Sequence, residues 1–163
     1  MQHNISIGKT VIVVALEKEY TKADLYTGIG PQSAYISMCD YLKNNEVSLV
    51  INYGTCGSLK DELSGILQVT GYYDLLTDSY KGSWDVVCLT GDKFHTTTPK
   101  NFGDIVDCEA YYLKKACDEF NVEFDCYKYI TDYVGSNSLT DWEEHLSQGS
   151  NLFDEILTDE KYR

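Results

Sequence analysis

Residues 48–58 read SLVINYGTCGS, and this stretch decides the fold. Its first part, Ser48 to Asn52, is a short apolar run that leads directly into the glycine-rich segment Gly54 to Ser58. This pattern predicts a buried strand that ends in a tight loop. An earlier run, Lys9 to Leu16 (KTVIVVAL), is apolar on both faces, which is typical of a central strand in a parallel sheet.

The segment between these two runs predicts a helix. A short strand, Asp24 to Thr27, leads into Gly28-Ile29-Gly30, and Pro31 suits the first position of a helix. Apolar residues then follow at helical spacing, and the pattern ends near Asn44-Asn45. The order strand, helix, strand predicts a right-handed βαβ crossover.

Patterns further along the chain extend this arrangement. Two strands are predicted, Ile66 to Tyr73 and Trp84 to Leu89, with a polar connection, Thr77 to Ser83, between them. An amphipathic helix, Cys108 to Phe120, and a last strand, Phe124 to Thr131, follow. A loop, Gly135 to Ser138, then leads to a terminal helix from about Thr140 to Leu157. Because neither a repeat nor a low-complexity linker interrupts the chain, we expect a single domain over residues 1–163. The fold class is α/β, with three α/β/α layers around a central mixed, mostly parallel sheet.

Charge and hydropathy exclude several classes of protein. The chain carries 13 Lys and Arg against 26 Asp and Glu, a formal charge of −13, and its only arginine is Arg163. Nucleic-acid binding is therefore not expected, because the phosphate backbone would be repelled. The longest apolar run, Val11 to Leu16, is far below the roughly 18 residues of a membrane span, and no secretory leader is recognisable. We expect a cytoplasmic protein that does not interact with membranes.

The cysteines and histidines do not predict a metal site. Six cysteines are scattered without a C-x-x-C pair, and we expect reduced, mostly buried thiols. The three histidines, His3, His95 and His145, have no ligand spacing relative to any cysteine. Neither a metal nor a cofactor is predicted.

Small ligands of open α/β sheets bind beyond the carboxyl ends of the strands, so the candidate site residues are those that follow each apolar run. These segments are Glu17 with Glu19, Gly28 to Gly30, Gly54 to Ser58, Gly91 to Phe94, Asp107 to Glu109, and Thr131 with Asp132. Any single acidic residue here has an ordinary interpretation as a solvated cap. Their recurrence at strand ends instead favours a site built from carboxylates.

Six ordered segments carry a family resemblance: Ala15-Leu16-Glu17-Lys18-Glu19, Thr27-Gly28-Ile29-Gly30, VINYGTCGSL (residues 50–59), Thr90-Gly91-Asp92-Lys93-Phe94, Val106-Asp107-Cys108-Glu109-Ala110 and Tyr129-Ile130-Thr131-Asp132. In the same order, they resemble six motifs of the nucleoside phosphorylase and nucleosidase superfamily. These are its first-strand acidic motif, its glycine turn, its glycine loop, its S-G-D-x-F segment, its V-E-M-E-A helix start and its I-S-D strand end. The resemblance is closest to the methylthioadenosine/S-adenosylhomocysteine nucleosidase branch. It implies cleavage of the N-ribosyl bond of a small-molecule purine nucleoside.

The resemblance also implies a role for each matched residue. Asp132 would protonate purine N7, and Glu19 would activate the attacking water. Glu109 would bind the ribose hydroxyls, where a carboxylate also favours a cationic transition state. The remaining substrate-contacting residues would be Phe94, which would stack on the base, Thr131, which would orient Asp132, and Thr55, Cys56, Gly57, Ile29 and Cys108.

Structural alternatives remain for these residues. Glu19 could be an exposed first-turn residue, Glu109 a charge that complements a helix dipole, and Asp132 a turn residue. Phe94 could belong to the core, and His95 could contact the substrate or lie at the surface. Glu17 is the fallback for the water base.

The residues also separate hydrolysis from phosphorolysis. Phosphorylases of the superfamily hold phosphate with arginines at the glycine turn and before the glycine loop, where this chain has Gly30-Pro31-Gln32 and Asn52. Water is therefore the expected nucleophile, and the expected substrate is a 5′-substituted adenosine of the methylthioadenosine, S-adenosylhomocysteine or 5′-deoxyadenosine type. The alternatives are a purine nucleoside phosphorylase and a non-catalytic protein that binds or sequesters a nucleoside.

The chain departs from the family pattern in three places. Only Tyr20 to Ala23 separates Glu19 from the second strand, the piece between Leu59 and Trp84 is short, and Asp107 stands where a Glu is usual. In family members the shortened parts help to form the 5′ pocket and the subunit interface. We expect a homo-oligomer, with its size and the 5′ substituent left open.

Overall fold

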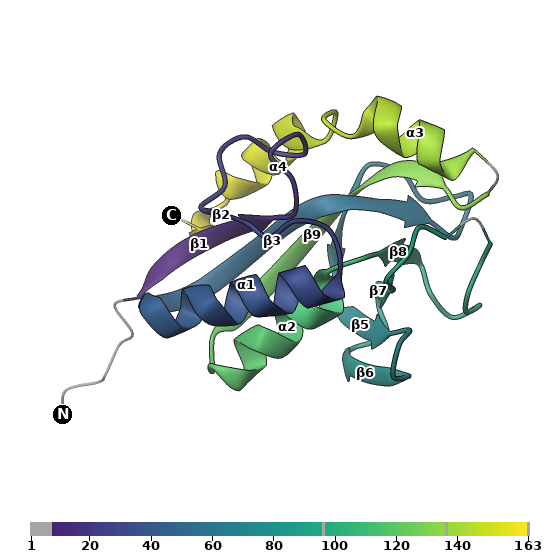
Figure 1. Ribbon diagram of the computed structural model, residues 1–163. Coiled ribbons are helices and arrows are strands. Elements are labelled where there is room, and N and C mark those ends of the chain that lie inside the picture. Colours follow the sequence, from purple (N-terminus) through teal and green to yellow (C-terminus); the bar gives the residue numbers. More distant parts are fainter. Residues whose placement is uncertain (1–7, 96, 136, 163) are drawn as a thin grey trace.

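Two long strands, β3 (Val47–Ser58) and β9 (Glu123–Tyr133), form the spine of the sheet in the computed structural model, which describes residues 8–95, 97–135 and 137–162. They pair in parallel along almost their whole length (Figure 1). On the other side of β3, β1 (Lys9–Val14) pairs in parallel, and β2 (Leu25–Tyr26) pairs in parallel with β1. The predicted order of strand, helix and parallel strand is thus confirmed.

The rest of the sheet continues from the end of β3. There β8 (Ile105–Asp107) pairs antiparallel with β3, and β7 (Val87–Thr90), β5 (Gly71–Asp74) and β6 (Ser79–Gly82) follow in that order toward the edge. The remaining strand, β4 (Ile66–Val69), pairs antiparallel with β9. Among the described strand pairs five are parallel and three antiparallel, so the sheet is mixed and mostly parallel, as predicted.

Helices cover both faces of the sheet and complete three layers (Figure 1). The helices α1 (Pro31–Asn44) and α2 (Ala110–Glu119) lie together on one face. The helices α3 (Ser138–His145) and α4 (Ser150–Leu157), followed by the 3-10 turn Glu160–Tyr162, lie on the other. The predicted three-layer α/β/α class is confirmed.

Helix α1 begins and ends where its sequence predicts. Gly30 precedes it with a φ of 111°, a conformation that favours glycine, and Pro31 occupies the first helical position. Ala34, Met38 and Leu42 form the buried stripe that packs on β1 and β3. Burying a Met or Leu side chain of this kind contributes roughly 1.5–3 kcal/mol, so the stripe holds the helix to the sheet.

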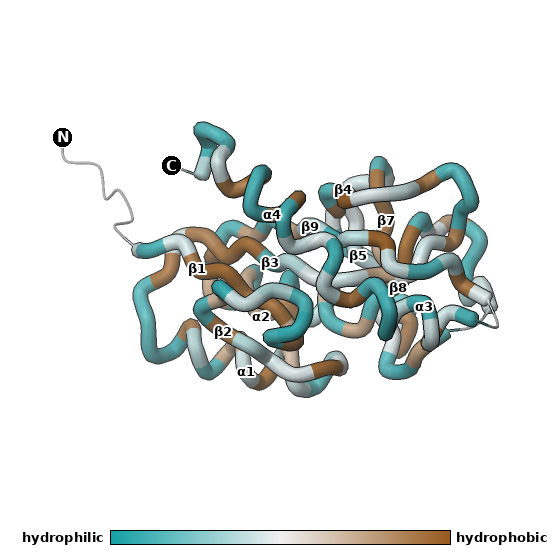
Figure 2. The backbone as a smooth tube through the Cα atoms, turned by 90° about the horizontal axis from the view of Figure 1, so that it is seen from above, coloured by the Kyte–Doolittle hydropathy of each residue, from teal (hydrophilic) through white to brown (hydrophobic). Residues whose placement is uncertain are grey.

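Aromatic packing holds α4 against the opposite face of the sheet. The ring of Phe153, from α4, is fully buried and stacks on Tyr53 of β3 with centroids 4.7 Å apart, and Tyr20 meets it edge-on at 5.0 Å. β1 and β3 therefore bury apolar side chains on both faces, as the run KTVIVVAL predicts. The brown, hydrophobic stretches of Figure 2 follow these two strands.

The predicted loop after residue 52 is wrong, because β3 continues to Ser58. Glycines permit this extension, since the β9 side chains approach the strand closely. A Cβ on Gly54 would lie 2.7 Å from Lys128 Nζ, and a Cβ on Gly57 would lie 2.9 Å from Asp132 Oδ2. The glycines make room for side chains here and do not mark a turn.

The middle of the chain also differs from the prediction. The expected strand Ile66 to Tyr73 is split at Thr70 into β4 and β5, which pair with different partners. The expected polar connection Thr77 to Ser83 contains the edge strand β6, and the short strand β8 has no predicted counterpart. β6 lies at the edge of the sheet and β8 has only three residues, so neither has enough apolar residues to give a recognisable strand pattern.

The expected single terminal helix is two helices, α3 and α4, separated by residues 146–149. The break follows from a close approach of the chain to the sheet. A Cβ on Gly149 would lie 2.2 Å from the Tyr53 hydroxyl and 2.4 Å from Tyr129 Cγ, so only glycine fits there.

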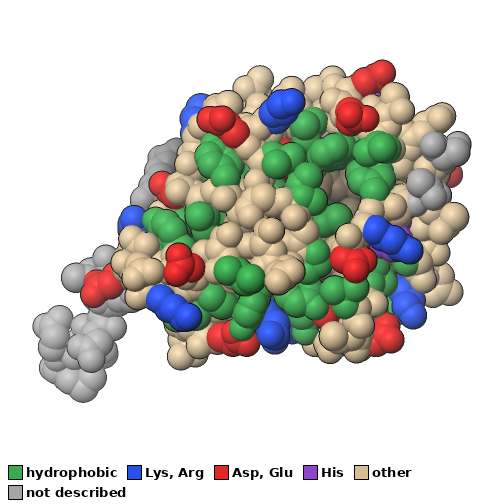
Figure 3. Space-filling model, viewed as in Figure 1, with side chains coloured by type: hydrophobic (Ala, Val, Ile, Leu, Met, Phe, Trp, Pro, Cys, Tyr) green, Lys and Arg blue, Asp and Glu red, His purple; other side chains and the backbone are tan. Residues whose placement is uncertain are grey.

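The surface reflects the acidic composition. On the face drawn in Figure 3, basic side chains stand singly beside acidic ones and do not gather into a basic patch. No helix within the described residues is long and apolar enough to cross a membrane.

Candidate active site

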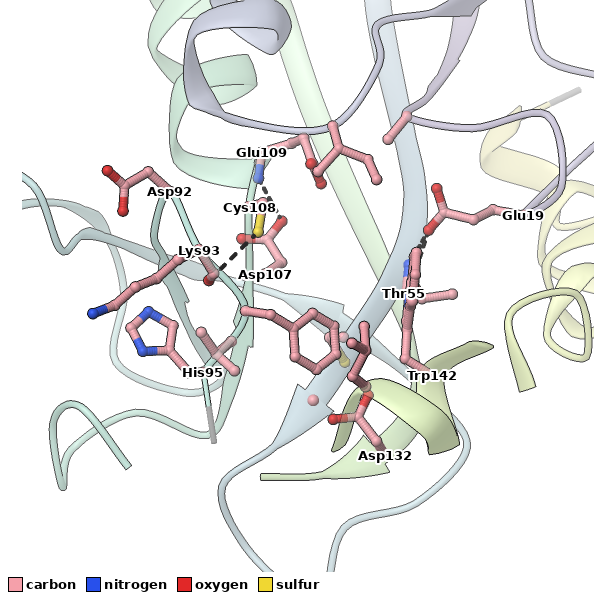
Figure 4. A pocket seen from close by; sticks show the side chains of 17 residues that line it. Glu19, Thr55, Asp92, Lys93, His95, Asp107, Cys108, Glu109, Asp132 and Trp142 are labelled. Carbon is pink, nitrogen blue, oxygen red and sulfur yellow. Dashed lines mark hydrogen bonds between the residues drawn. The ribbon is translucent and has the colours of Figure 1, made fainter. Parts of the chain in front are cut away.

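A cavity of roughly 310 Å³ opens at the carboxyl ends of β3 and β9, beside β8. Its lining includes all of the predicted site residues except Thr131: Glu19, Ile29, Thr55, Cys56, Gly57, Phe94, Cys108, Glu109 and Asp132. In Figure 4 the carboxylates of Glu19, Glu109 and Asp132 lie on different walls of this space, and Asp92 and Asp107 also line it. Segments far apart in the sequence thus converge at the edge where ligands of α/β sheets bind.

Glu19 lies in the turn after β1 and is only 4% exposed. Its Oε2 accepts hydrogen bonds from the Thr55 amide at 2.9 Å and the Thr55 hydroxyl at 2.7 Å, and its Oε1 accepts one from the Leu16 amide at 3.1 Å. Burial raises the pKa of Glu19, while the Thr55 hydrogen bonds and the nearby Lys128 charge oppose this rise. The side chain is a desolvated, fixed carboxyl group.

Glu109 immediately precedes α2 and reaches toward the glycine turn. Its Oε2 accepts a hydrogen bond from the Gly30 amide at 2.9 Å. Burial, and then the charge of Asp107, raise the pKa of Glu109 to about 8. A positive charge placed in the cavity would therefore favour the ionised form of Glu109.

Asp132 lies near the end of β9 and is 3% exposed. The Thr131 hydroxyl donates to its Oδ1 at 2.8 Å, which places Thr131 behind the carboxyl and outside the cavity lining. Burial, helped by the charge of Asp141, raises the pKa of Asp132 to about 6, while the hydrogen bond from Thr131 works against the rise. A carboxyl with such a pKa keeps its proton in a usable fraction of molecules near neutrality.

A buried ion pair that the sequence analysis missed lies behind these residues. The Lys128 ammonium, fully buried in β9, is 2.9 Å from Asp107 Oδ2. The contact lies off the direction of a hydrogen bond and is chiefly electrostatic. Burial alone would lower the pKa of Lys128 and raise that of Asp107, but their mutual attraction keeps both charged.

The pair is held by several further contacts. The Asp107 carboxylate accepts hydrogen bonds from the Thr90 hydroxyl at 2.6 Å and from the Ala110 amide at 2.8 Å. The Lys128 charge lowers the pKa of both Glu19 and Glu109, so one cation is shared by two cavity carboxyls. A lysine within the otherwise apolar and aromatic run Cys126 to Ile130 is the signal that could have found it.

Trp142 is a second residue whose position the sequence did not reveal. It comes from α3, lines the cavity and donates its indole N–H to Thr55 Oγ1 at 2.9 Å. Its ring also faces Phe94, with centroids 5.8 Å apart and the planes tilted by 60°. Trp142 and Phe94 form an aromatic wall above the carboxyl groups.

The geometry excludes most of the structural alternatives. Glu19 is not exposed, Asp132 lies in a strand and not in a turn, and Phe94 lines the cavity. The fallback residue Glu17 is exposed and outside the cavity lining. The catalytic and binding roles assigned to the cavity residues stay predictions.

His95 and Cys108 also line the cavity. His95 lies beside Lys93 on one wall, and its Nε2 is buried without a hydrogen-bond partner among the described residues. Burial lowers the pKa of His95 and raises that of the Cys108 thiol. Both groups are therefore mostly neutral at pH 7, and Cys108 is a poor nucleophile.

The cavity offers little to hold an anion such as phosphate. Lys93 is the only lysine or arginine in its described lining, and in Figure 4 its ammonium reaches away from the carboxyl groups. Asn52, at one of the two phosphorylase arginine positions, is buried and donates to the Val13 carbonyl at 2.9 Å. Within the described part of the chain, no three His, Cys, Asp or Glu side chains form a potential metal site.

Comparisons of the sequence with known proteins find no relative. No protein-family model matches the chain, and no curated protein matches it either. The fold, in contrast, is widely represented among solved structures.

Three solved structures illustrate the likeness. A mutant of the Helicobacter pylori enzyme MTAN, with 5′-methylthioadenosine in its active site, matches with a TM-score of 0.80 and 16% identity over 94% of this chain and 99% of that one. Futalosine hydrolase from Helicobacter pylori matches with a TM-score of 0.79 and 15% identity over 94% and 98%. The 5′-methylthioadenosine/S-adenosylhomocysteine nucleosidase from Neisseria meningitidis, in complex with methylthio-immucillin-A, matches with a TM-score of 0.77 and 13% identity over 88% and 94%. The chain therefore has the nucleosidase fold.

Proposed function

We propose that the protein hydrolyses the N-ribosyl bond of a 5′-substituted adenosine and releases adenine and the free sugar. One observation carries the proposal: besides Asp107, which is paired with Lys128, three buried carboxyl groups from three separate segments line one cavity whose described lining has no arginine to hold phosphate. Simple binding of a neutral nucleoside does not need three desolvated acids. Their cost in stability is explained if they act on a substrate.

The chemistry assigns the first role to Asp132. Cleavage of the bond leaves positive charge on the sugar and negative charge on the purine, so a proton donor at the base lowers the barrier. Asp132, with a pKa of about 6, serves as this acid and delivers its proton to purine N7. The Thr131 hydroxyl holds Oδ1, which directs Oδ2 to the cavity beside Gly57.

Glu109 and Glu19 serve the sugar side of the reaction. Glu109, once its proton has passed to solvent on binding of the substrate, accepts hydrogen bonds from the ribose hydroxyls, and its carboxylate stabilises the growing positive charge of the ribosyl cation. Glu19, which already accepts three hydrogen bonds, takes a proton from the attacking water. Because the cavity carries little positive charge, water is favoured over phosphate as the nucleophile.

The aromatic wall and the rim of the cavity indicate the kind of nucleoside. Phe94 stacks on the purine, and a cavity of roughly 310 Å³ lies within the size range of small-molecule sites. Ile29 and Leu139 line the cavity while half-exposed, so this part of the open rim is apolar. An apolar 5′ substituent suits this rim, and methylthioadenosine is our first candidate.

A substrate panel tests the proposal. Purified protein is incubated with methylthioadenosine, S-adenosylhomocysteine, 5′-deoxyadenosine, adenosine and futalosine, the last because one structural neighbour is a futalosine hydrolase. We expect base release from at least one 5′-substituted member at a rate well above that of adenosine. Tight binding without release from any member would replace the proposal with a nucleoside-sequestering function. Release that requires phosphate would indicate a phosphorylase.

The pH dependence follows from the raised pKa of Asp132. An ordinary Asp would be ionised throughout the neutral range, but this carboxyl stays at least half protonated up to about pH 6. We expect kcat/KM to fall by about tenfold for each pH unit above that value, because the acid form of the free protein becomes scarce. A profile measured from about pH 5 to 9 checks this, and a flat profile on the alkaline side would contradict the role of Asp132.

The assembly of the protein is a separate proposal. We expect a homo-oligomer, because the nucleosidase resemblance implies one and half-exposed apolar side chains surround the cavity mouth. Light scattering at several concentrations measures the mass in solution, and a monomer at every concentration would contradict this expectation.

A further inference from the structure

Trp142 makes a contact that the proposed reaction does not by itself explain. Its indole N–H donates to Thr55 Oγ1 at 2.9 Å, and the same oxygen lies 2.7 Å from Glu19 Oε2. The three residues come from α3, β3 and the turn after β1. They form a short hydrogen-bond chain that ends at the proposed water base.

The donors and acceptors in this chain have only one arrangement. An indole nitrogen donates and never accepts, so the Thr55 oxygen must accept from Trp142. The Thr55 hydroxyl has a single proton, and that proton is then free to point at Glu19. We propose that Trp142 is a positioning residue that fixes the Thr55 hydroxyl as a donor to the Glu19 carboxylate. This inference rests on the proposed hydrolase function and names a residue that controls its water base.

The consequence is a defined orientation for Glu19. Oε2 accepts two hydrogen bonds, both from Thr55, while Oε1 accepts one, from the Leu16 amide. Since each carboxylate oxygen has two lone pairs, a single acceptor position remains, on Oε1. By fixing the Thr55 hydroxyl, Trp142 therefore acts together with the Thr55 and Leu16 amides to leave Oε1 as the oxygen of Glu19 that faces the attacking water.

Other charged or titratable groups also act on Glu19. Lys128 in β9 supplies a positive charge, Tyr53 in β3 has a buried hydroxyl, and Glu109 contributes a like charge across the cavity. Burial, and then the charge of Glu19, raise the pKa of Tyr53, so this phenol stays neutral in the working range. Thr55 is the neighbour that a change at Trp142 alters directly.

Helix α3 is anchored so that it can hold this orientation. The Ser138 hydroxyl donates to the Tyr133 and Gly135 carbonyls at 3.1 and 2.8 Å, and His145 Nδ1 lies 3.0 Å from the Thr131 carbonyl. Both anchors are on or beside the end of β9 that carries Asp132. The helix thus connects the proposed acid with the proposed base.

Nuclear magnetic resonance tests the contact without any need for activity. The chain has two tryptophans, and Trp84 is 62% exposed, so the two indole N–H signals are easily distinguished. A Trp84→Phe variant assigns them. We expect the Trp142 signal to lie downfield, to exchange slowly and to shift as Glu19 titrates, and we expect Thr55→Val to abolish that shift. A Trp142 signal that is indifferent to Thr55→Val would overturn the inference.

Kinetics test the consequence. Trp142→Phe keeps an aromatic ring of smaller size and removes the donor, so we expect kcat to fall roughly tenfold with KM changed less than threefold. The acidic limb of the kcat profile moves upward in pH, because Glu19 loses a fixed hydrogen bond to its ionised form. Trp84→Phe is the matched control and leaves both parameters unchanged.

A double variant separates this role from general support of the fold. In a Thr55→Val background, Trp142→Phe has nothing left to orient, so we expect it to add no further change in the pH profile. Fully additive effects would overturn the inference. If wild-type protein releases no base from any nucleoside while the indole signal still follows Glu19, the hydrolase proposal fails and the hydrogen-bond chain stands.

Discussion

Asp132→Asn lowers kcat for adenine release by roughly 10³-fold, within the range measured for loss of a general acid. The amide keeps the size of the carboxyl and still accepts the Thr131 hydrogen bond, but it has no acidic proton for purine N7. KM changes little, because the substrate contacts made by Phe94 and Glu109 remain. Steady-state kinetics on the best substrate of the panel measure both parameters.

The same variant has a predicted effect on stability. Since the folded-state pKa of Asp132 is raised to about 6, its contribution to stability is complete at low pH and is lost as pH rises through that value. Asp132→Asn is therefore as stable as wild type or more stable at pH 8. Glu144→Gln, on the exposed side of α3, is the matched control and changes neither activity nor stability. Unchanged kinetics in Asp132→Asn would contradict the mechanism.

Lys128→Met lowers the free energy of unfolding by roughly 3–5 kcal/mol, because it leaves the Asp107 carboxylate buried without its counter-ion. That loss is a large fraction of the 5–15 kcal/mol typical of a domain, and the variant will be marginal at 37 °C. Urea denaturation of the two proteins at equal concentration measures the difference.

Two further variants show whether the effect belongs to the buried pair. Lys115→Met breaks an ion pair with Glu119 of 3.6 Å between two partly exposed side chains, and it should cost less than about 1 kcal/mol. The double variant Lys128→Met, Asp107→Asn removes both charges and should recover much of the loss. A cost for Lys128→Met no greater than that for Lys115→Met would contradict the assigned role of the pair.

The central part of the fold was predictable because its signals are local and periodic. The runs around Val11 and Val50 bury both faces of their strands, and α1 begins at Pro31 and ends at Asn44, as its spacing predicts. Those elements follow from side-chain periodicity within a single segment. The edge strand β6 and the three-residue strand β8 depend on partners elsewhere in the sheet, so their own sequences give little indication of them.

The same distinction between local and distant signals applies to the residues of the candidate site. Residues at strand ends, such as Glu19 and Asp132, were placed because the position of a strand end follows from the strand itself. Trp142 and Lys128 were not, because each acts through a contact with a segment more than 20 residues away. The glycines at positions 54 and 57 were assigned to a loop, although they make room for Lys128 and Asp132.

Analysis of the sugar product distinguishes hydrolysis from phosphorolysis and, in the same experiment, tests the role of Asp132. Wild-type protein and Asp132→Asn are incubated with the best nucleoside of the panel, with and without phosphate, and the products are identified by mass spectrometry. We expect the wild type to release adenine equally in both buffers, with free sugar as its only sugar product. We expect almost no release of adenine from Asp132→Asn. A sugar phosphate, or release that is equal in the two proteins, would contradict the proposal.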